Sequence, residues 1–268
     1  MNKVLKICLA LLSGLSALAA SGSISPSSAS PLLWQLDQYS DNLGDCITYI
    51  SHDGVKVVCK KLKCEVLTSA PDWKVHCYRT DEKIEWVNDL ANFGGDYMSN
   101  PFARGRKLKE FKFVEQGTGN IKGLVYTKYK TKKSANDMLY TANDIAVAPQ
   151  VSEFLARLYV TPPSAKIPIY RCLDHGKGKK LEEAKIGTIN VGVNADLRTG
   201  IVDKLTTKSW KKVAFTNTIF KAPSGYKRTK ELFQATYSEN KKGEFSEMFD
   251  EIGYKSNSSA LKNENKNK

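Results

Sequence analysis

Apolar and polar positions alternate with a period of two through most of the chain from Cys46 onward. Such alternation predicts β-strands with one buried face and one solvated face. In the first run, the Asp-Gly pair within 51–54 predicts a hairpin turn. Further turns are predicted at 69–72, 80–83 and 117–120. Consecutive strands joined by short turns form an antiparallel meander.

The second half of the chain continues this pattern. Strands are expected near 111–114, 121–129, 138–140, 167–172, 186–193 and 213–220. Helical spacing is confined to a few short segments, so the predicted fold class is α+β, dominated by one large antiparallel sheet with few helices.

Three segments have the apolar spacing of a helix. Residues 32–39 predict a short amphipathic helix that ends near 42–44. Pro149 suits a first helical turn, and the apolar residues of 151–159 share one helical face. A short terminal helix is expected at 245–252.

The N-terminus has the layout of a secretory signal peptide over residues 1–20. Two lysines precede an apolar run, and Ala-Leu-Ala at 17–19 places small residues before the predicted cleavage site. The run is shorter than the roughly 20 residues of a membrane span. We therefore expect an exported protein, periplasmic or extracellular, with a flexible serine-rich leader at 21–31. A single domain at 32–254 and a disordered basic tail at 255–268 would follow.

The chain is basic, with a formal net charge of +13 at pH 7. A basic exported protein can bind acidic lipid headgroups, anionic envelope polymers or nucleic acid. Lysine or arginine is mixed with aromatic residues at 106–112 and 126–133, a pattern that can stack bases and neutralise phosphates. Export favours an envelope component, so no nucleic-acid partner is expected. The alternative is a solvated lysine surface that keeps the protein soluble.

Cysteines point to disulfides rather than to a metal site. Cys8 would leave with the signal peptide, and the cysteines that remain are Cys46, Cys59, Cys64, Cys77 and Cys172. The first four of these are clustered, and export makes disulfides the expected state of such a cluster. Hairpin register favours Cys46 with Cys59 and Cys64 with Cys77, one of three connectivities. Unpaired buried thiols or a zinc site are the alternatives, but no Cys-x-x-Cys pair is present, so no metal is expected.

Catalytic motifs do not stand out in the sequence. It contains no Gly-x-Ser-x-Gly, phosphate loop or His-Glu-x-x-His. We therefore expect a non-enzymatic protein without a cofactor. A hydrolase that uses Asp174-His175 is the remaining catalytic alternative, although nothing marks its nucleophile.

Four strings are similar to segments of exported proteins with a lipoprotein-carrier-like fold. They are ISHDGVKV at 50–57, SAPDWKV at 69–75, GLVYTKY at 123–129 and IFKAPSGY at 219–226. This resemblance implies a large curved antiparallel sheet, an incomplete barrel, whose concave face is covered by helices. In relatives of this kind, the space between sheet and helices holds acyl chains or another apolar ligand.

Such a cavity would have a helical lid and an aromatic wall. Its lid candidates are Phe154, Leu155, Leu158 and Tyr159, and its wall candidates are Trp73, Trp86, Tyr126 and Tyr129. The expected function is a monomeric exported protein that binds a lipid or other apolar ligand there, or acts at the envelope surface. Two alternatives stay open: these residues simply pack the core, or the protein is a basic surface binder of anionic envelope polymers.

Overall fold

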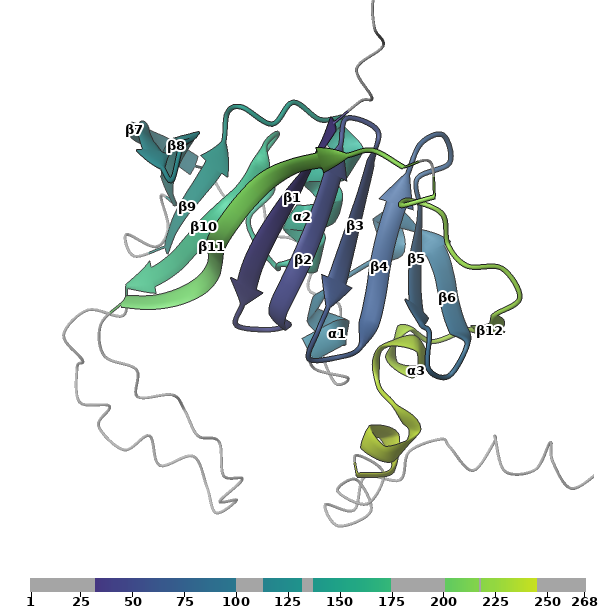
Figure 1. The fold of residues 1–268 in the computed structure, drawn as a ribbon. Helices are drawn as coiled ribbons and strands as arrows, with labels where there is room; N and C mark the ends of the chain where they lie inside the picture. Colours follow the sequence, from purple (N-terminus) through teal and green to yellow (C-terminus); the bar gives the residue numbers. More distant parts are fainter. Residues whose placement is uncertain (1–31, 100–112, 132–136, 175–200, 217, 245–268) are drawn as a thin grey trace, which may run out of the picture. The chain divides into compact units, whose positions relative to one another are not determined.

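The computed structural model describes residues 32–99, 113–131, 137–174, 201–216 and 218–244. Its strands are β1 (Leu32–Ser40), β2 (Gly44–Ser51), β3 (Gly54–Cys59), β4 (Cys64–Ser69), β5 (Lys74–Arg79), β6 (Ile84–Asp89), β7 (Phe113–Ile121), β8 (Leu124–Thr131), β9 (Asp137–Ala142), β10 (Ile167–Asp174), β11 (Ile201–Ala214) and β12 (Lys227–Thr229). They form a 12-stranded sheet in the order β12-β6-β5-β4-β3-β2-β1-β11-β10-β9-β8-β7 (Figure 1).

The sheet consists of two meanders joined through β11. Strands β1 to β6 follow one another as hairpins, and β7 to β10 form the second run. β11 pairs with β1 along one edge and with β10 along the other. The two outermost strands, β12 and β7, lie at opposite ends of the order, so the sheet is not closed into a barrel. The expectation of a fold dominated by one large sheet with few helices is therefore confirmed.

One pair of strands differs from the expected antiparallel pattern. β12 runs parallel to β6, with Lys227 opposite Ile84 and Thr229 opposite Trp86. Every other pair in the described sheet is antiparallel. A parallel pair needs a long connection, and here about half of the chain separates the two strands. The sheet is mixed rather than purely antiparallel.

The predicted helix at 32–39 is wrong, because these residues form β1. This strand has β2 on one side and β11 on the other, and Leu36 and Gln38 are fully buried between them. The apolar spacing of the segment suits either structure over so short a length. Backbone hydrogen bonds to β11, about 170 residues further along the chain, decide between the two.

The predicted turn at 117–120 and the predicted strand at 213–220 also need correction. Residues 117–120 lie within β7, and the turn falls at Lys122 and Gly123, whose φ values are +51° and +87°. The last long strand is β11, which ends at Ala214. The turns near 51–54 and 80–83 are confirmed. The strand expected at 186–193 and the helix expected at 245–252 lie outside the described residues.

Helical segments pack against the sheet and complete the core. They are η1 (Leu90–Asn92), α1 (Asp96–Ser99), α2 (Pro149–Leu158) and α3 (Leu232–Thr236). The predicted central helix is confirmed as α2, with proline in its first turn. Phe154 of α2 stacks on Phe93 at 5.4 Å between ring centroids, which ties the helix to the segment after β6. Within the described residues, no helix has the length and apolar character needed to span a membrane.

Candidate functional site

The predicted lid residues belong to the packed core. Phe154, Leu155 and Leu158 have no exposed surface, and Tyr159 is 3% exposed. The Tyr159 hydroxyl donates a hydrogen bond to Gln38 Oε1 at 2.9 Å. Burial raises the pKa of Tyr159 well above its usual range, so this hydroxyl stays protonated. The hydrogen bond from Tyr159 to Gln38 thus ties the end of the lid segment to β1.

The predicted wall residues lie in different surroundings. Trp86 is buried, and its ring lies 6.2 Å from that of Phe93. Trp73 belongs to the turn before β5, with a φ of +53°, rather than to the strand expected there. Tyr126 and Tyr129 are both on β8 but, three residues apart, they point to opposite faces. The structure therefore groups the lid with Trp86 and does not align all four wall residues along one wall.

A row of tyrosines crosses three neighbouring strands. Tyr126 of β8 stacks on Tyr140 of β9 at 4.8 Å with an interplanar angle of 12°. Tyr170 of β10 lies directly opposite Tyr140, with 5.0 Å between their ring centroids. Lys128 also lies opposite Tyr140, and its Nζ is 5.7 Å from the centre of that ring. Because ammonium groups are attracted to aromatic faces, the ring holds this charge over the row.

The hydroxyl at the end of the row is fixed by a carboxylate. Tyr170 donates a hydrogen bond to Asp203 Oδ1 at 2.6 Å. Burial and this hydrogen bond raise the pKa of Tyr170 far above its usual value. The phenol therefore remains a neutral donor, and its ring orientation is held from β11.

A second aromatic group lies against the turn between β7 and β8. Trp34 and Trp210 lie 5.1 Å apart, and Lys212 Nζ is 4.8 Å from the centre of the Trp34 ring. Trp210 Nε1 donates to the carbonyl of Lys122 in the β7–β8 turn at 2.8 Å. A side chain on Gly123 would meet the Trp210 ring at 3.3 Å, so this turn lies close against the indole.

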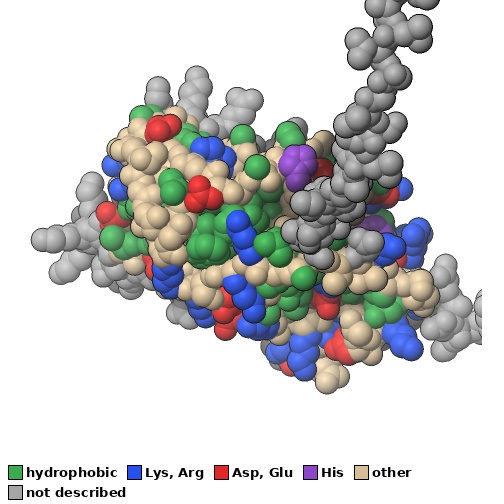
Figure 2. Space-filling model, turned by 45° about the horizontal axis from the view of Figure 1, so that its top comes forward, with side chains coloured by type: hydrophobic (Ala, Val, Ile, Leu, Met, Phe, Trp, Pro, Cys, Tyr) green, Lys and Arg blue, Asp and Glu red, His purple; other side chains and the backbone are tan. Residues whose placement is uncertain are grey.

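Strand register places the two groups on opposite faces of the sheet, because Tyr170 and Tyr39 both lie opposite Thr206, whereas Trp34 is five residues from Tyr39 on the same strand. We call the first group the aromatic–lysine surface. Its members are Tyr126, Lys128, Tyr140 and Tyr170. The aromatic members are half-buried, so each packs on the protein with one part and meets solvent with another. On the face shown in Figure 2, hydrophobic side chains gather in a patch and Lys or Arg side chains lie beside it.

Sequence reasoning found this surface only in part. Tyr126 and Lys128 belong to segment 126–133, whose mixture of lysine and aromatic residues predicts a capacity to stack bases and neutralise phosphates. Tyr140 and Tyr170 were missed, because their place in the row depends on the register of β9 and β10. The local signal in β8 is that Tyr126 and Lys128 are two positions apart, which places both side chains on one face of a strand.

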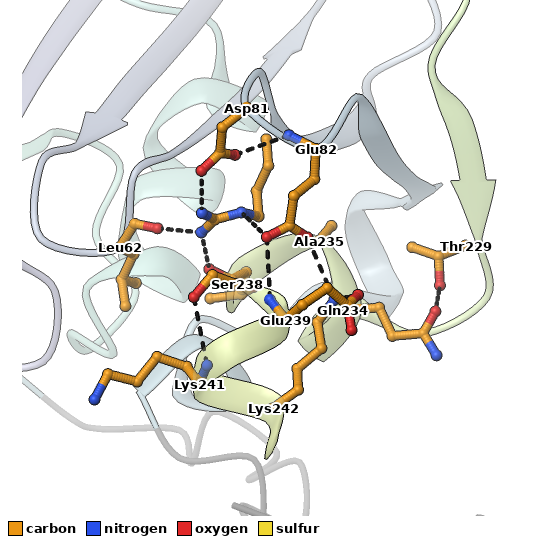
Figure 3. A network of polar contacts seen from close by, with 12 residues as sticks. Leu62, Asp81, Glu82, Thr229, Gln234, Ala235, Ser238, Glu239, Lys241 and Lys242 are labelled. Carbon is orange, nitrogen blue, oxygen red and sulfur yellow. Dashed lines mark hydrogen bonds and ion pairs between the residues drawn. The ribbon is translucent and has the colours of Figure 1, made fainter. Parts of the chain in front are cut away.

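Arg79 forms a buried polar network at the other end of the sheet (Figure 3). Its Nη1 donates to the carbonyls of Leu62 at 2.6 Å and Thr236 at 3.2 Å. Its Nη2 donates to Asp81 Oδ2 at 2.5 Å, and Glu82 Oε1 lies 3.6 Å from Nε. One guanidinium thus joins the β3–β4 turn, the β5–β6 turn and α3.

A surface cavity of about 660 Å³ adjoins this network. Side chains of both charges line it: Lys61, Lys63, Lys241, Asp81, Glu82 and Glu239. Lys242 lies 3.6 Å from Glu82 Oε2 and 2.8 Å from Glu239 Oε1, so the acids are already paired. Because the lining carries both charges and its acids are already in ion pairs, we interpret the Arg79 network as a structural clasp that holds α3 against the two turns. It does not have the excess of one charge that would select an oppositely charged ligand.

The described cysteines carry free thiols, and all five are buried. Cys46, Cys59, Cys64 and Cys77 form a row on the core face of β2 to β5: Cys46 lies opposite Cys59, Cys59 lies opposite Cys64, and Cys77 lies one diagonal step from Cys64. The neighbouring thiols of Cys46 and Cys64, together with burial, raise the pKa of Cys59. The neighbouring thiols of Cys59 and Cys77, together with the charge of Arg79, lower the pKa of Cys64. Among the described residues, no three His, Cys, Asp or Glu side chains converge to hold a metal ion.

Only half of the catalytic alternative falls within the described residues. Asp174 is the last residue of β10, and His175 lies outside the described residues. Two other histidines pair with carboxylates: His52 Nδ1 is 2.6 Å from Asp53, and His76 Nδ1 is 2.7 Å from Glu85. The first pair is exposed in a turn, and the second links β5 to β6.

Comparison of the chain with protein-family models and with curated proteins finds no match. Among solved structures, an uncharacterized conserved protein from Thermus thermophilus is similar, with 9% sequence identity and a TM-score of 0.37. The match covers 74% of this chain and 90% of that protein's chain.

Proposed function

We propose that this chain is an exported, non-enzymatic protein that binds an anionic envelope polysaccharide through the aromatic–lysine surface. One observation carries the proposal: three tyrosine rings form a row across β8, β9 and β10, with the Lys128 ammonium 5.7 Å from the central ring. The row combines apolar ring faces with a positive charge. An acidic polysaccharide has the matching features, apolar faces on its sugar rings and negative charges.

The chemistry of such a polymer matches the surface. Sugar rings present apolar C–H faces that pack on aromatic rings, and their carboxylates or phosphates pair with ammonium groups. The rings of Tyr126 and Tyr140 are already ordered by stacking, so binding costs them little conformational entropy. The net charge, +13 for the full chain and +11 once Lys3 and Lys6 leave with the predicted signal peptide, attracts a polyanion from a distance and raises the rate of encounter.

The cavity between sheet and helices is less well supported as a site. Phe154, Leu155 and Leu158 would form its lid, but they are fully buried against the sheet. Core residues of this kind are close-packed, and space for an acyl chain would require them to move. An apolar ligand, a single domain at 32–254 and a curved incomplete barrel of the lipoprotein-carrier-like kind remain proposals.

Equilibrium titration with fluorescently labelled polygalacturonate tests the proposed function. We expect Tyr140→Leu to weaken binding about tenfold, since a lost aromatic contact of ~1.4 kcal/mol corresponds to that factor. Lys128→Gln should weaken it about threefold, as for an exposed ionic contact of ~0.5–1 kcal/mol. Neutral dextran should bind far more weakly than polygalacturonate, because it lacks the carboxylates.

Lys230→Gln is the matched control for net charge, because Lys230 is exposed and lies outside the aromatic–lysine surface. Its affinity should equal that of the unmodified protein. Equal losses for Lys230→Gln and Lys128→Gln would show that total charge alone drives binding. Unchanged affinity in Tyr140→Leu would remove the tyrosine row from the proposed site.

A further inference from the structure

The cysteine row lies across two adjacent hairpins. Cys46 of β2 is directly opposite Cys59 of β3, and Cys59 is directly opposite Cys64 of β4. Cys77 of β5 lies opposite Val66, one diagonal step from Cys64. Strand register therefore orders the four side chains across the sheet as Cys46, Cys59, Cys64 and Cys77.

We propose that oxidation converts this row into two disulfides, Cys46–Cys59 and Cys64–Cys77, and leaves Cys172 as a free thiol. A disulfide can form only between thiols that are neighbours in the row. Pairing the first cysteine with the second and the third with the fourth is the one arrangement that leaves none of the four unpaired. A bond between the inner pair, Cys59 and Cys64, would strand Cys46 and Cys77 at opposite ends.

Backbone register favours the first of these bonds. Lys60 N donates to Asp45 O at 3.0 Å, so the adjacent pair Cys46 and Cys59 occupies a non-hydrogen-bonded position. Opposed side chains are closest at such positions of an antiparallel pair. In a β-strand, the N–H and C=O of one residue point to the same neighbouring strand. Those of Cys59 point away from β2 and towards β4, so Cys59 and Cys64 occupy a hydrogen-bonded position. Opposed side chains are further apart at such a position.

The second bond forms where the strand begins. Cys64 is the first residue of β4, so a small backbone shift there does not disturb the rest of the strand. Cys77 lies one diagonal step from Cys64 on the neighbouring strand β5. Both proposed bonds lie within a single hairpin, β2–β3 or β4–β5. They can therefore form while each hairpin is still open to solvent, before the core buries the thiols.

Cys172 has no place in this pairing. It lies on β10, and β11 and β1 separate that strand from β2 in the sheet. In each proposed bond, two thiols transfer two electrons and two protons to a disulfide oxidant, such as oxidised glutathione. The oxidant is released as two thiols, so the exchange is balanced.

Peptide mapping after oxidative refolding tests the proposal. The full chain is reduced, unfolded, refolded with oxidised glutathione, alkylated and digested with trypsin. Cleavage after Lys56, Lys60, Lys63 and Lys74 places each cysteine of the row on its own peptide. We expect cross-linked peptides for the two proposed bonds, a loss of four hydrogen atoms, and alkylation of Cys172 and of any retained Cys8.

Two variants make the result specific. Cys172→Ser should leave both cross-links in place. Cys46→Ser should leave the Cys64–Cys77 link and expose Cys59 to alkylation. A Cys59–Cys64 link in the unmodified chain, or alkylation of all four row members, would overturn the proposal. So would a link that includes Cys172. These outcomes are independent of polymer binding, so the two proposals fail separately.

Discussion

Tyr237 lies beside α3, where its hydroxyl donates a hydrogen bond to the carbonyl of Met98 at 2.8 Å. Burial, with a smaller contribution from Cys64, raises the pKa of Tyr237 to about 12 from its ordinary value of 10.0. The folded protein thus holds this proton more tightly than the unfolded chain. The corresponding stability is complete below pH 10 and is lost as the pH rises towards 12.

Tyr237→Phe removes both this hydrogen bond and this titration. We expect the variant to be about 1 kcal/mol less stable at neutral pH, from the lost hydrogen bond. Between pH 10 and 12 its stability should fall less steeply than that of the unmodified protein. Urea unfolding across this range measures the difference, which isolates Tyr237 from the other buried tyrosines. Parallel stability curves would contradict the assigned role.

At the scale of elements, α3 depends on the guanidinium of Arg79. Arg79→Met keeps much of the side-chain volume but leaves the carbonyls of Leu62 and Thr236 without this donor. Asp81 also loses this ion-pair partner, but its side chain is 48% exposed and is solvated instead. We expect a loss of roughly 2–4 kcal/mol in unfolding free energy, because each of the two carbonyls is left without a donor at a cost of ~1–2 kcal/mol. Amide hydrogen exchange should also become faster at 232–236, because α3 loses its link to two turns.

Arg228→Met is the matched control, because the Arg228 side chain is 75% exposed and its Nε lies 3.7 Å from Glu85. Its unfolding free energy should change by no more than about 0.5 kcal/mol. An Arg79→Met variant that unfolds at the same urea concentration as Arg228→Met would show that the clasp does not stabilise α3.

Elements with local signals could be predicted from the sequence. The hairpins from β2 to β6 have alternating strands and short turns, and α2 has Pro149 in its first turn and one apolar face. β1 could not be predicted, because its spacing also suits a helix and its partner β11 is distant in sequence. The parallel pair of β12 and β6 has no local signal at all.

The residues of the candidate site also divide into those with a local sequence signal and those that depend on the pairing of distant strands. Segment 126–133 showed the mixture of lysine and aromatic residues, so Tyr126 and Lys128 were within reach of sequence reasoning. Their alignment with Tyr140 and Tyr170 arises from strand register, which the sequence does not encode locally. The apolar face of α2 was identified correctly, but only packing shows that it is buried against the sheet.

At the scale of the whole molecule, the positive net charge and the aromatic–lysine surface act together. The charge attracts a polyanion over a distance that salt shortens, to about 10 Å at 0.1 M ionic strength. The rings act only on contact, so they select where the polymer binds. Binding should therefore weaken as salt is added, while the place of contact stays the same.

The most direct test of this account is a hydrogen-exchange footprint of the full chain with and without saturating polygalacturonate. The account predicts slower exchange in β8, β9 and β10 and in the β7–β8 turn, with β4 to β6 unchanged. Protection confined to β4–β6, or spread evenly over the lysine-bearing surface, would contradict binding at the tyrosine row.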